Sequence, residues 1–182
     1  MILDEFMPAW HFRERHAIRI AAPPARVFAA IKEVRATEIA FFNILVWIRR
    51  GGRSGPESIL NPGASAPLLE VATRSGFIYL ADDAPRELVV GTVVIAPPGI
   101  DCAPTPQMFN TTLAPGYALA AMNFLVTPDD PNGSLVSTET RVFTNSPSAR
   151  RRFARYWRLI YPGSALIRRM WLRAVKRRAT RG

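Results

Sequence analysis

The sequence has little of the chemistry that many catalytic and metal sites use. It contains a single cysteine, Cys102, and two histidines in 182 residues. One cysteine cannot form an intrachain disulfide or a multi-cysteine metal site, so we expect a reducing compartment and a cytoplasmic protein. His11 and His16 lie on opposite faces of a predicted strand and cannot share a metal ion. We expect neither a metal ion nor a cofactor, and Cys102 is predicted to be an ordinary loop residue.

Long hydrophobic runs are also missing. The most apolar run, residues 39–48, is about half as long as the roughly 20 residues that a helix needs to cross a bilayer. The first ten residues are acidic and lack the basic start and apolar core of a secretion signal. Hydrophobic residues make up 48% of the sequence, as in globular proteins, and the length predicts one domain over residues 1–182.

Acidic residues are absent after Glu139. All 14 Asp and Glu lie at or before this position, whereas 13 of the 24 Lys and Arg follow it. The formal net charge of +10 therefore comes from the C-terminal segment. Such a basic surface attracts anionic groups, so an anionic membrane surface is a candidate partner, while nucleic acid is not expected. The simpler alternative is a solvated helix face whose arginine stems cover apolar surface.

Residues 146–179 are predicted to form one long helix with an apolar stripe. Ser146 offers an N-cap hydroxyl and Pro147 suits the first helical position. The stripe recurs at steps of three or four and consists of Phe153, Trp157, Ile160, Ser164, Ile167, Trp171 and Val175. It keeps its phase across Pro162, which predicts one helix that is kinked near Tyr161. At about 1.5 Å per residue this helix is roughly 50 Å long, so it needs a sheet to pack on.

The rest of the chain predicts that sheet. Residues 10–20 alternate as a strand, and their inner face carries Glu14 and His16 among apolar side chains. Two short helices are predicted at 25–34 and 38–50, further strands at 76–80, 87–96, 117–127 and 134–144, and irregular connections at 51–67 and 97–116; residues 68–74 are ambiguous between helix and strand. This order predicts an α+β fold in which a curved antiparallel sheet wraps around the long helix.

Five short motifs carry a likeness to a known family. They are residues 14–16 (ERH), 21–28 (AAPPARVF), 87–91 (ELVVG), 137–142 (STETRV) and 152–157 (RFARYW). Together they resemble the SRPBCC superfamily of START-like, helix-grip proteins, and more closely its small bacterial members of unassigned role. The resemblance implies a hydrophobic cavity between the sheet and the C-terminal helix. Relatives hold lipids, sterols or polyketides there and some are cyclases, but the resemblance implies no catalytic residues for this chain.

Polar residues on two predicted strands are candidates for the floor of this cavity. Glu14 and His16 share one face of the first strand, and Glu139 and Arg141 share one face of the strand at 134–144. If the latter face also points inward, the four side chains form one charge-compensated group whose carboxylate–imidazole pair can act as a general base. The alternative is a structural polar network that joins the first and last strands.

The long helix supplies the remaining candidates. Phe153, Trp157 and Tyr161 are predicted to line the cavity, with Tyr161 and Ser164 offering hydrogen bonds beside the kink, and Asn123 is a further ligand-binding candidate. Core packing is the simpler alternative for the aromatic stripe. We predict a non-enzymatic protein that binds a small hydrophobic ligand. The alternatives are a polyketide cyclase/aromatase-like enzyme and an adaptor whose basic helix docks on an anionic membrane or an acidic partner.

Overall fold

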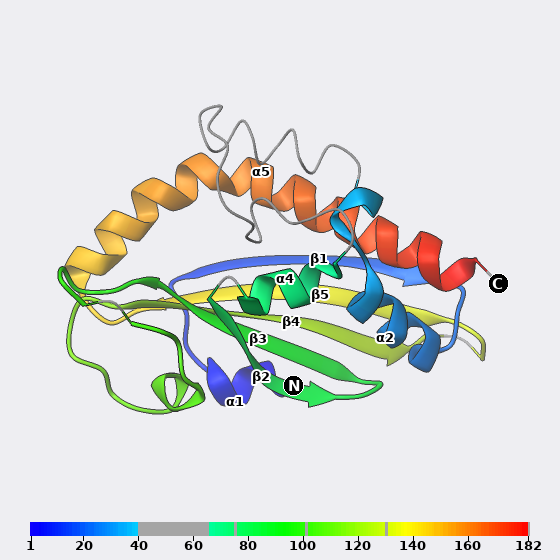
Figure 1. Cartoon of the computed structure of the whole chain (residues 1–182), viewed down its shortest axis with the longest axis horizontal. Helices are drawn as coiled ribbons and strands as arrows, with labels where there is room; N and C mark the ends of the chain where they lie inside the picture. Colours follow the sequence, from blue (N-terminus) through cyan, green and yellow to red (C-terminus); the bar gives the residue numbers. More distant parts are fainter. Residues whose placement is uncertain (40–65, 75, 101, 130, 182) are drawn as a thin grey trace.

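The computed structural model describes residues 1–39, 66–74, 76–100, 102–129 and 131–181, and it has the predicted α+β helix-grip arrangement (Figure 1). Five antiparallel strands form one sheet in the order β1-β5-β4-β3-β2. The strands are β1 (Phe12–Ile20), β2 (Phe77–Asp83), β3 (Glu87–Ile95), β4 (Ala118–Pro128) and β5 (Ser134–Thr144). The helices are α1 (Leu3–Phe6), α2 (Pro24–Glu33), α4 (Leu68–Arg74) and α5 (Pro147–Thr180), with 3₁₀ turns η1 (Ala36–Glu38) and η2 (Pro106–Phe109).

α5 is one continuous helix, as predicted. The hydroxyl of Ser146 accepts a hydrogen bond from the N–H of Ala149 at 3.2 Å, and Pro147 lies in the first turn. Pro162 lies inside the helix, where it has no N–H to donate to the carbonyl of the preceding turn. α5 bows away from the sheet in its middle and returns to it at both ends (Figure 1). No helix in the described part of the chain is long and apolar enough to span a membrane.

In the described part of the chain, three helices (α2, α4 and α5) lie on one side of the sheet, which we call the helix face. α2 packs against α5, and α4 packs against α2 and β2. The buried side chains of α2 and α4 join those of the strands in the main core. This core includes Val27, Ile31, Leu69, Phe124, Trp171 and Val175. Burial of Leu68, Leu69, Val71 and Ala72 settles residues 68–74 as a helix. The predicted second short helix and the connection at 51–67 fall mostly on residues 40–65, outside the described part of the chain.

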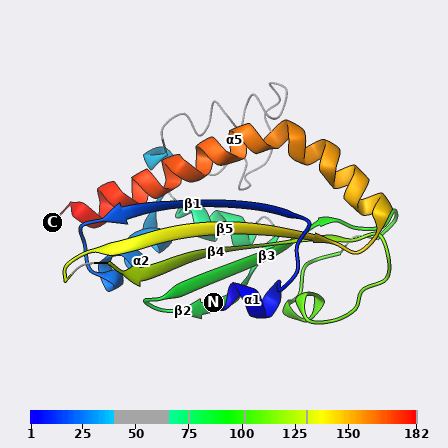
Figure 2. The same ribbon diagram turned by 180° about the vertical axis from the view of Figure 1, so that it is seen from behind.

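The opposite side of the sheet, the far face, is covered by two elements that we did not predict. α1 and η2 lie on the side of the sheet away from α5 (Figures 1 and 2). Leu3 and Met7 pack there with Val89, and Phe109 of η2 packs over β3. Gly91 permits this contact, because a Cβ at that position would lie 2.5 Å from the Phe109 ring. Residues 97–100 and 102–116 are irregular apart from η2, as predicted.

The predicted strand boundaries hold to within a few residues, with one larger difference at β2. This strand continues to Asp83, past an irregularity between Tyr79 and Ala81, whereas we predicted that it ends at residue 80. β2 is an edge strand, so the exposed carboxylates of Asp82 and Asp83 can pair with Lys32 and Arg86 instead of ending the strand.

Candidate functional site

The strand register separates the polar residues that we expected to find together. Glu14 of β1 lies opposite Thr140 of β5, and Arg15 lies opposite Glu139. Opposed residues in an antiparallel pair point to the same face of a sheet. Glu14 and His16 are therefore on the helix face, whereas Glu139 and Arg141 are on the far face. Glu14, Glu139 and Arg141 are buried and His16 is partly buried. The predicted group of four side chains does not form, because the two pairs lie on opposite sides of the sheet.

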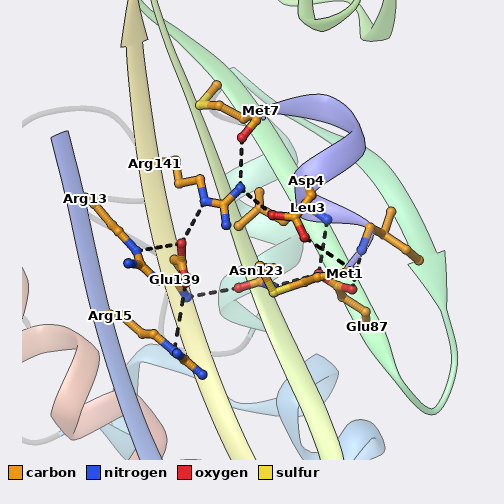
Figure 3. Close-up of polar contacts among 11 residues, drawn as sticks. Met1, Leu3, Asp4, Met7, Arg13, Arg15, Glu87, Asn123, Glu139 and Arg141 are labelled. Carbon is orange, nitrogen blue, oxygen red and sulfur yellow. Dashed lines mark hydrogen bonds and ion pairs between the residues drawn. The ribbon is translucent and has the colours of Figure 1, made fainter. Parts of the chain in front are cut away.

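Glu139 and Arg141 belong to a polar network on the far face (Figure 3). The Glu139 carboxylate accepts hydrogen bonds from Arg13 Nε at 2.8 Å and from Arg141 Nε at 2.7 Å. Arg141 Nη1 donates to the Met7 carbonyl and forms an ion pair with Asp4. Burial raises the pKa of Glu139, but the hydrogen bonds and charges of Arg13 and Arg141 outweigh it, so this pKa lies below its usual value.

Asn123 extends this network and has a structural position. Its Nδ2 donates to Glu87 at 2.7 Å, and its Oδ1 accepts the N–H of Glu139 at 3.0 Å. Glu87 in turn accepts the N–H groups of Ile2 and Leu3. The network therefore holds α1 against the sheet (Figure 3). This arrangement corresponds to the alternative in which Glu139 and Arg141 tie strands together.

A hollow of about 560 Å³ lies beside this network on the far face, between residues 6–9 and the stretch at 108–115. Its walls are mostly apolar. The amide of Asn145 at its edge is already used, because it accepts the N–H groups of Gly116 and Tyr117 and donates to the carbonyls of Leu113 and Ala114. Among the described residues, no buried unpartnered polar side chain faces this hollow. Nothing in it points to a ligand, so we place the candidate site on the other face.

The candidate site is a cavity of about 320 Å³ between the sheet and α5. α5 contributes Phe153, Tyr156, Trp157, Ile160, Ser164, Ile167, Arg168 and Trp171 to its wall. The sheet contributes small and apolar side chains, among them Thr92, Ala120, Met122, Thr140 and Val142. This volume is at the lower end of the roughly 300–1,000 Å³ typical of ligand pockets. The expected cavity between sheet and helix is thus present.

A hydrogen-bonded group of three side chains lies at the wall of the cavity. Ser164 Oγ donates to Glu14 Oε2 at 2.9 Å, and His16 Nε2 lies 2.8 Å from Glu14 Oε1. Glu14 is 4% exposed and stands between the other two. The order is serine–carboxylate–imidazole, so the imidazole does not contact the serine as the base of a hydrolase triad would. A carboxylate in this position can accept a proton, but Ser164, rather than Glu14, lines the cavity.

Three buried donors near the cavity have no hydrogen-bond partner among the described residues: Thr138 Oγ1, Arg168 Nη1 and Trp171 Nε1. They lie close together. The Arg168 guanidinium is 6.0 Å from the centre of the Trp171 ring, and Trp171 packs edge-on against Phe124, which is the register partner of Thr138. Unpartnered buried polar groups are rare in folded proteins because each loses its bonds to water.

Arg168 is the charged member of this group. It forms no ion pair with any described residue; the carboxylate that influences it is Glu14. Burial lowers the pKa of Arg168 to about 10, and the charge of Glu14 opposes the shift. The guanidinium therefore stays protonated at neutral pH and places a positive charge at the wall of an apolar cavity.

The predicted site residues divide between the two faces and the solvent. Phe153, Trp157 and Ser164 line the cavity, and Glu14 and His16 lie directly behind Ser164. Glu139, Arg141 and Asn123 lie on the far face and cannot reach it. Tyr161 is 41% exposed on α5 and is not part of the cavity wall, although its ring packs on Trp157 at 5.5 Å between centroids.

We did not predict Arg168, Trp171 or Thr138 as site residues. A signal for Arg168 was available, since it lies four residues after Ser164 and three before Trp171, both in the apolar stripe. An arginine at that spacing differs from Arg155, Arg158 and Arg169, which are exposed on the helix. Thr138 had no such signal because its neighbours across the sheet depend on the register.

Comparisons with known proteins give low similarity. No protein-family model matches the chain, and no curated protein sequence matches it. Among solved structures, a protein from Mesorhizobium loti has a TM-score of 0.40 at 13% identity, covering 90% of this chain and 98% of its own. A conserved protein from Geobacillus kaustophilus has a TM-score of 0.40 at 9% identity, covering 91% and 96%. The Zhui aromatase/cyclase from a Streptomyces species has a TM-score of 0.36 at 12% identity, covering 93% and 96%. These TM-scores are below 0.5, so the ligand and the chemistry are not inferred from these structures.

Proposed function

We propose that this chain is a helix-grip binding protein of the SRPBCC type that holds a small, mostly apolar molecule between its sheet and α5. The observation that carries the proposal is the cavity of about 320 Å³ with two buried, unpartnered donors at its wall, Arg168 Nη1 and Trp171 Nε1, and a third, Thr138 Oγ1, behind it. A ligand with an apolar body and a polar end would fill the space and satisfy the donors. The family resemblance of the sequence supports the same function.

Binding is better supported than catalysis. A cyclase-type reaction needs a proton-transfer group within hydrogen-bond reach of the substrate. Glu14 is the candidate, but its two carboxylate oxygens are engaged by Ser164 and His16, and it does not line the cavity. Glu14 and His16 are therefore better explained as residues that hold Ser164 in place than as a catalytic base.

The proposal predicts that filling the cavity abolishes ligand retention. Ala120 lines the cavity, so the ring of Ala120→Phe would occupy ligand space. Native mass spectrometry of the purified protein should detect a retained small molecule in the wild type and none in this variant. The matched control is Ala17→Phe, an exposed position on the far face of β1, which should retain the ligand.

Thermal unfolding gives a second measurement on the same variants. A ligand that binds only the folded state raises the midpoint temperature of unfolding, and the stabilisation grows with the logarithm of the ratio of ligand concentration to Kd. We expect lipid and aromatic probes to shift the wild type and Ala17→Phe but not Ala120→Phe. The proposal fails if no extract or probe leaves a bound mass or a thermal shift, or if Ala120→Phe binds as well as the wild type.

A second candidate function, which we infer from the outer side of α5, is docking on an anionic membrane surface. Leu159 is 82% exposed and Leu166 is 44% exposed, and they lie two helical turns apart on the same side of the bow. Exposed arginines flank them, including Arg155, Arg158 and Arg169. Apolar side chains between cations are typical of helices that bind the interface of an anionic bilayer.

A further inference from the structure

We propose that the ligand of the cavity carries an acidic group, such as a carboxylate, which Arg168 and Trp171 bind while its apolar body lies along α5. This inference rests on the proposed binding function and adds the chemical class of the ligand. It depends on the three unpartnered donors described above.

The donors select the type of group. Arginine and the indole nitrogen donate hydrogen bonds and cannot accept them, and a threonine hydroxyl can donate one. The complementary ligand group is therefore an acceptor. An amine is excluded because it would bring a second positive charge next to the Arg168 guanidinium.

The charge of Arg168 selects an anion over a neutral acceptor. A guanidinium matches a carboxylate geometrically because two parallel N–H groups face two oxygens. The positive charge of Arg168 is only partly balanced by the described residues. The charge of Glu14 acts to raise the pKa of Arg168, but the two side chains form no ion pair. The carboxylate oxygens of Glu14 contact Ser164 and His16 instead. An acidic ligand group would supply the missing partner.

The remaining wall of the cavity fits an apolar body. Phe153, Trp157 and Ile160 extend from Arg168 toward the N-terminal half of α5, and Val142 and Ala120 face them from the sheet. An acid bound at Arg168 would thus place its hydrocarbon part along this row. A small inorganic anion would satisfy the donors but leave the apolar wall unfilled.

The test compares molecules that share a carbon skeleton and differ at one end. Isothermal titration calorimetry with decanoic acid, decanol and decylamine is repeated with the aromatic pair naphthoic acid and naphthalenemethanol. We expect each acid to bind about tenfold to a hundredfold more tightly than its alcohol, the range given by one charge-assisted hydrogen bond, and the amine to bind most weakly. Inorganic phosphate at the same concentration should compete poorly with the acids.

Substitutions at Arg168 test whether this residue causes the preference for acids over alcohols. Arg168→Met keeps an unbranched apolar stem but removes the guanidinium, so the affinity of the acids should fall to that of the alcohols while the alcohols bind as before. Arg169→Met is the matched control, since Arg169 is the exposed neighbour, and it should keep the preference. Arg168→Lys, which keeps the charge, should keep part of the preference and serves if Arg168→Met does not fold.

The outcomes separate this inference from the proposed function. If acids and alcohols bind equally well, or if Arg168→Met keeps the preference, the inference is wrong although the cavity still binds apolar molecules. If neither acid binds, or phosphate competes as well as the acids, the inference is also wrong. Equal binding of all probes to the wild type and to Ala120→Phe would instead reject the cavity itself.

Discussion

Arg141 and Arg168 lie on opposite faces of the sheet, and their surroundings differ. Arg141 is 3% exposed and is compensated by Glu139, Asp4 and the Met7 carbonyl. Arg168 has a buried guanidinium nitrogen without a partner among the described residues. Burying a charge is costly unless it is paired and hydrogen-bonded. We therefore read Arg141 as a structural residue and Arg168 as a binding residue.

The compensation of Arg141 predicts a pH-dependent stability. The folded-state pKa of Glu139 lies below its usual value of 4.5, so folding favours the ionised carboxylate. Its stabilisation is fully present above about pH 4.5 and is lost as the pH falls through the folded-state pKa. Glu139→Gln should lower the free energy of unfolding at pH 7 by roughly 3 kcal/mol, the cost of breaking a buried ion pair.

Urea unfolding followed by circular dichroism at several pH values measures this difference. The difference in free energy of unfolding between the wild type and Glu139→Gln should become smaller below about pH 4.5, because a protonated glutamate resembles glutamine. Glu33→Gln is the control, since Glu33 pairs with Arg178 at the surface and should change stability by less than about 1 kcal/mol. A gap that stays constant down to acid pH would contradict the role assigned to Glu139.

At the scale of elements, helices and strands could be predicted where the sequence contains a local pattern such as a cap or an apolar stripe. The long helix has a cap, a first-turn proline and an unbroken stripe, so its limits and continuity were predictable. The side on which Glu139 and Arg141 lie was not, because alternation defines two faces of a strand but not which of them meets the helix. That depends on the pairing of β1 with β5. α1 has four residues, too few for a periodic pattern.

Pro162 in the middle of α5 is expected to lower the stability of the protein and to raise its affinity for cavity ligands. Proline in a helix interior removes a hydrogen bond and costs about 3 kcal/mol. Pro162→Ala should restore the bond, raise the free energy of unfolding by roughly 1–3 kcal/mol and let the helix straighten. A straighter helix brings Ile160 and Ser164 closer to the sheet, so the affinity for cavity ligands should fall. Chemical unfolding and calorimetry on one preparation measure both effects.

Gly163→Ala is the matched control for this change. A Cβ at Gly163 would have nothing within 4 Å, so the substitution fits without rearrangement. It should add about 0.5–1 kcal/mol of stability through helix propensity and leave the affinity unchanged. If Pro162→Ala binds as tightly as the wild type, the bow comes from packing on the sheet and not from the proline.

On the scale of the whole molecule, positive charge and ligand cavity lie on opposite sides of one helix. The inner side of α5 forms the cavity wall, while its outer side carries most of the cations that follow Glu139. Ligand binding and surface docking therefore use different residues of α5 and can be tested separately. A change on the outer side should leave the cavity intact.

Docking on an anionic membrane predicts binding that depends on both charge and apolar contact. The protein should sediment with vesicles that contain phosphatidylglycerol, bind phosphatidylcholine vesicles weakly, and dissociate as salt shortens the Debye length below about 10 Å. Arg155→Gln with Arg158→Gln should weaken binding by about 2 kcal/mol, or roughly thirtyfold. Leu159→Ser should also weaken vesicle binding, whereas Ile100→Ser, at an exposed apolar position outside α5, should not.

The cavity-filling variant Ala120→Phe should sediment like the wild type, because the outer side of α5 is unchanged. Sedimentation that is insensitive to salt, or unaffected by the arginine and leucine changes, would rule out this surface as the membrane contact.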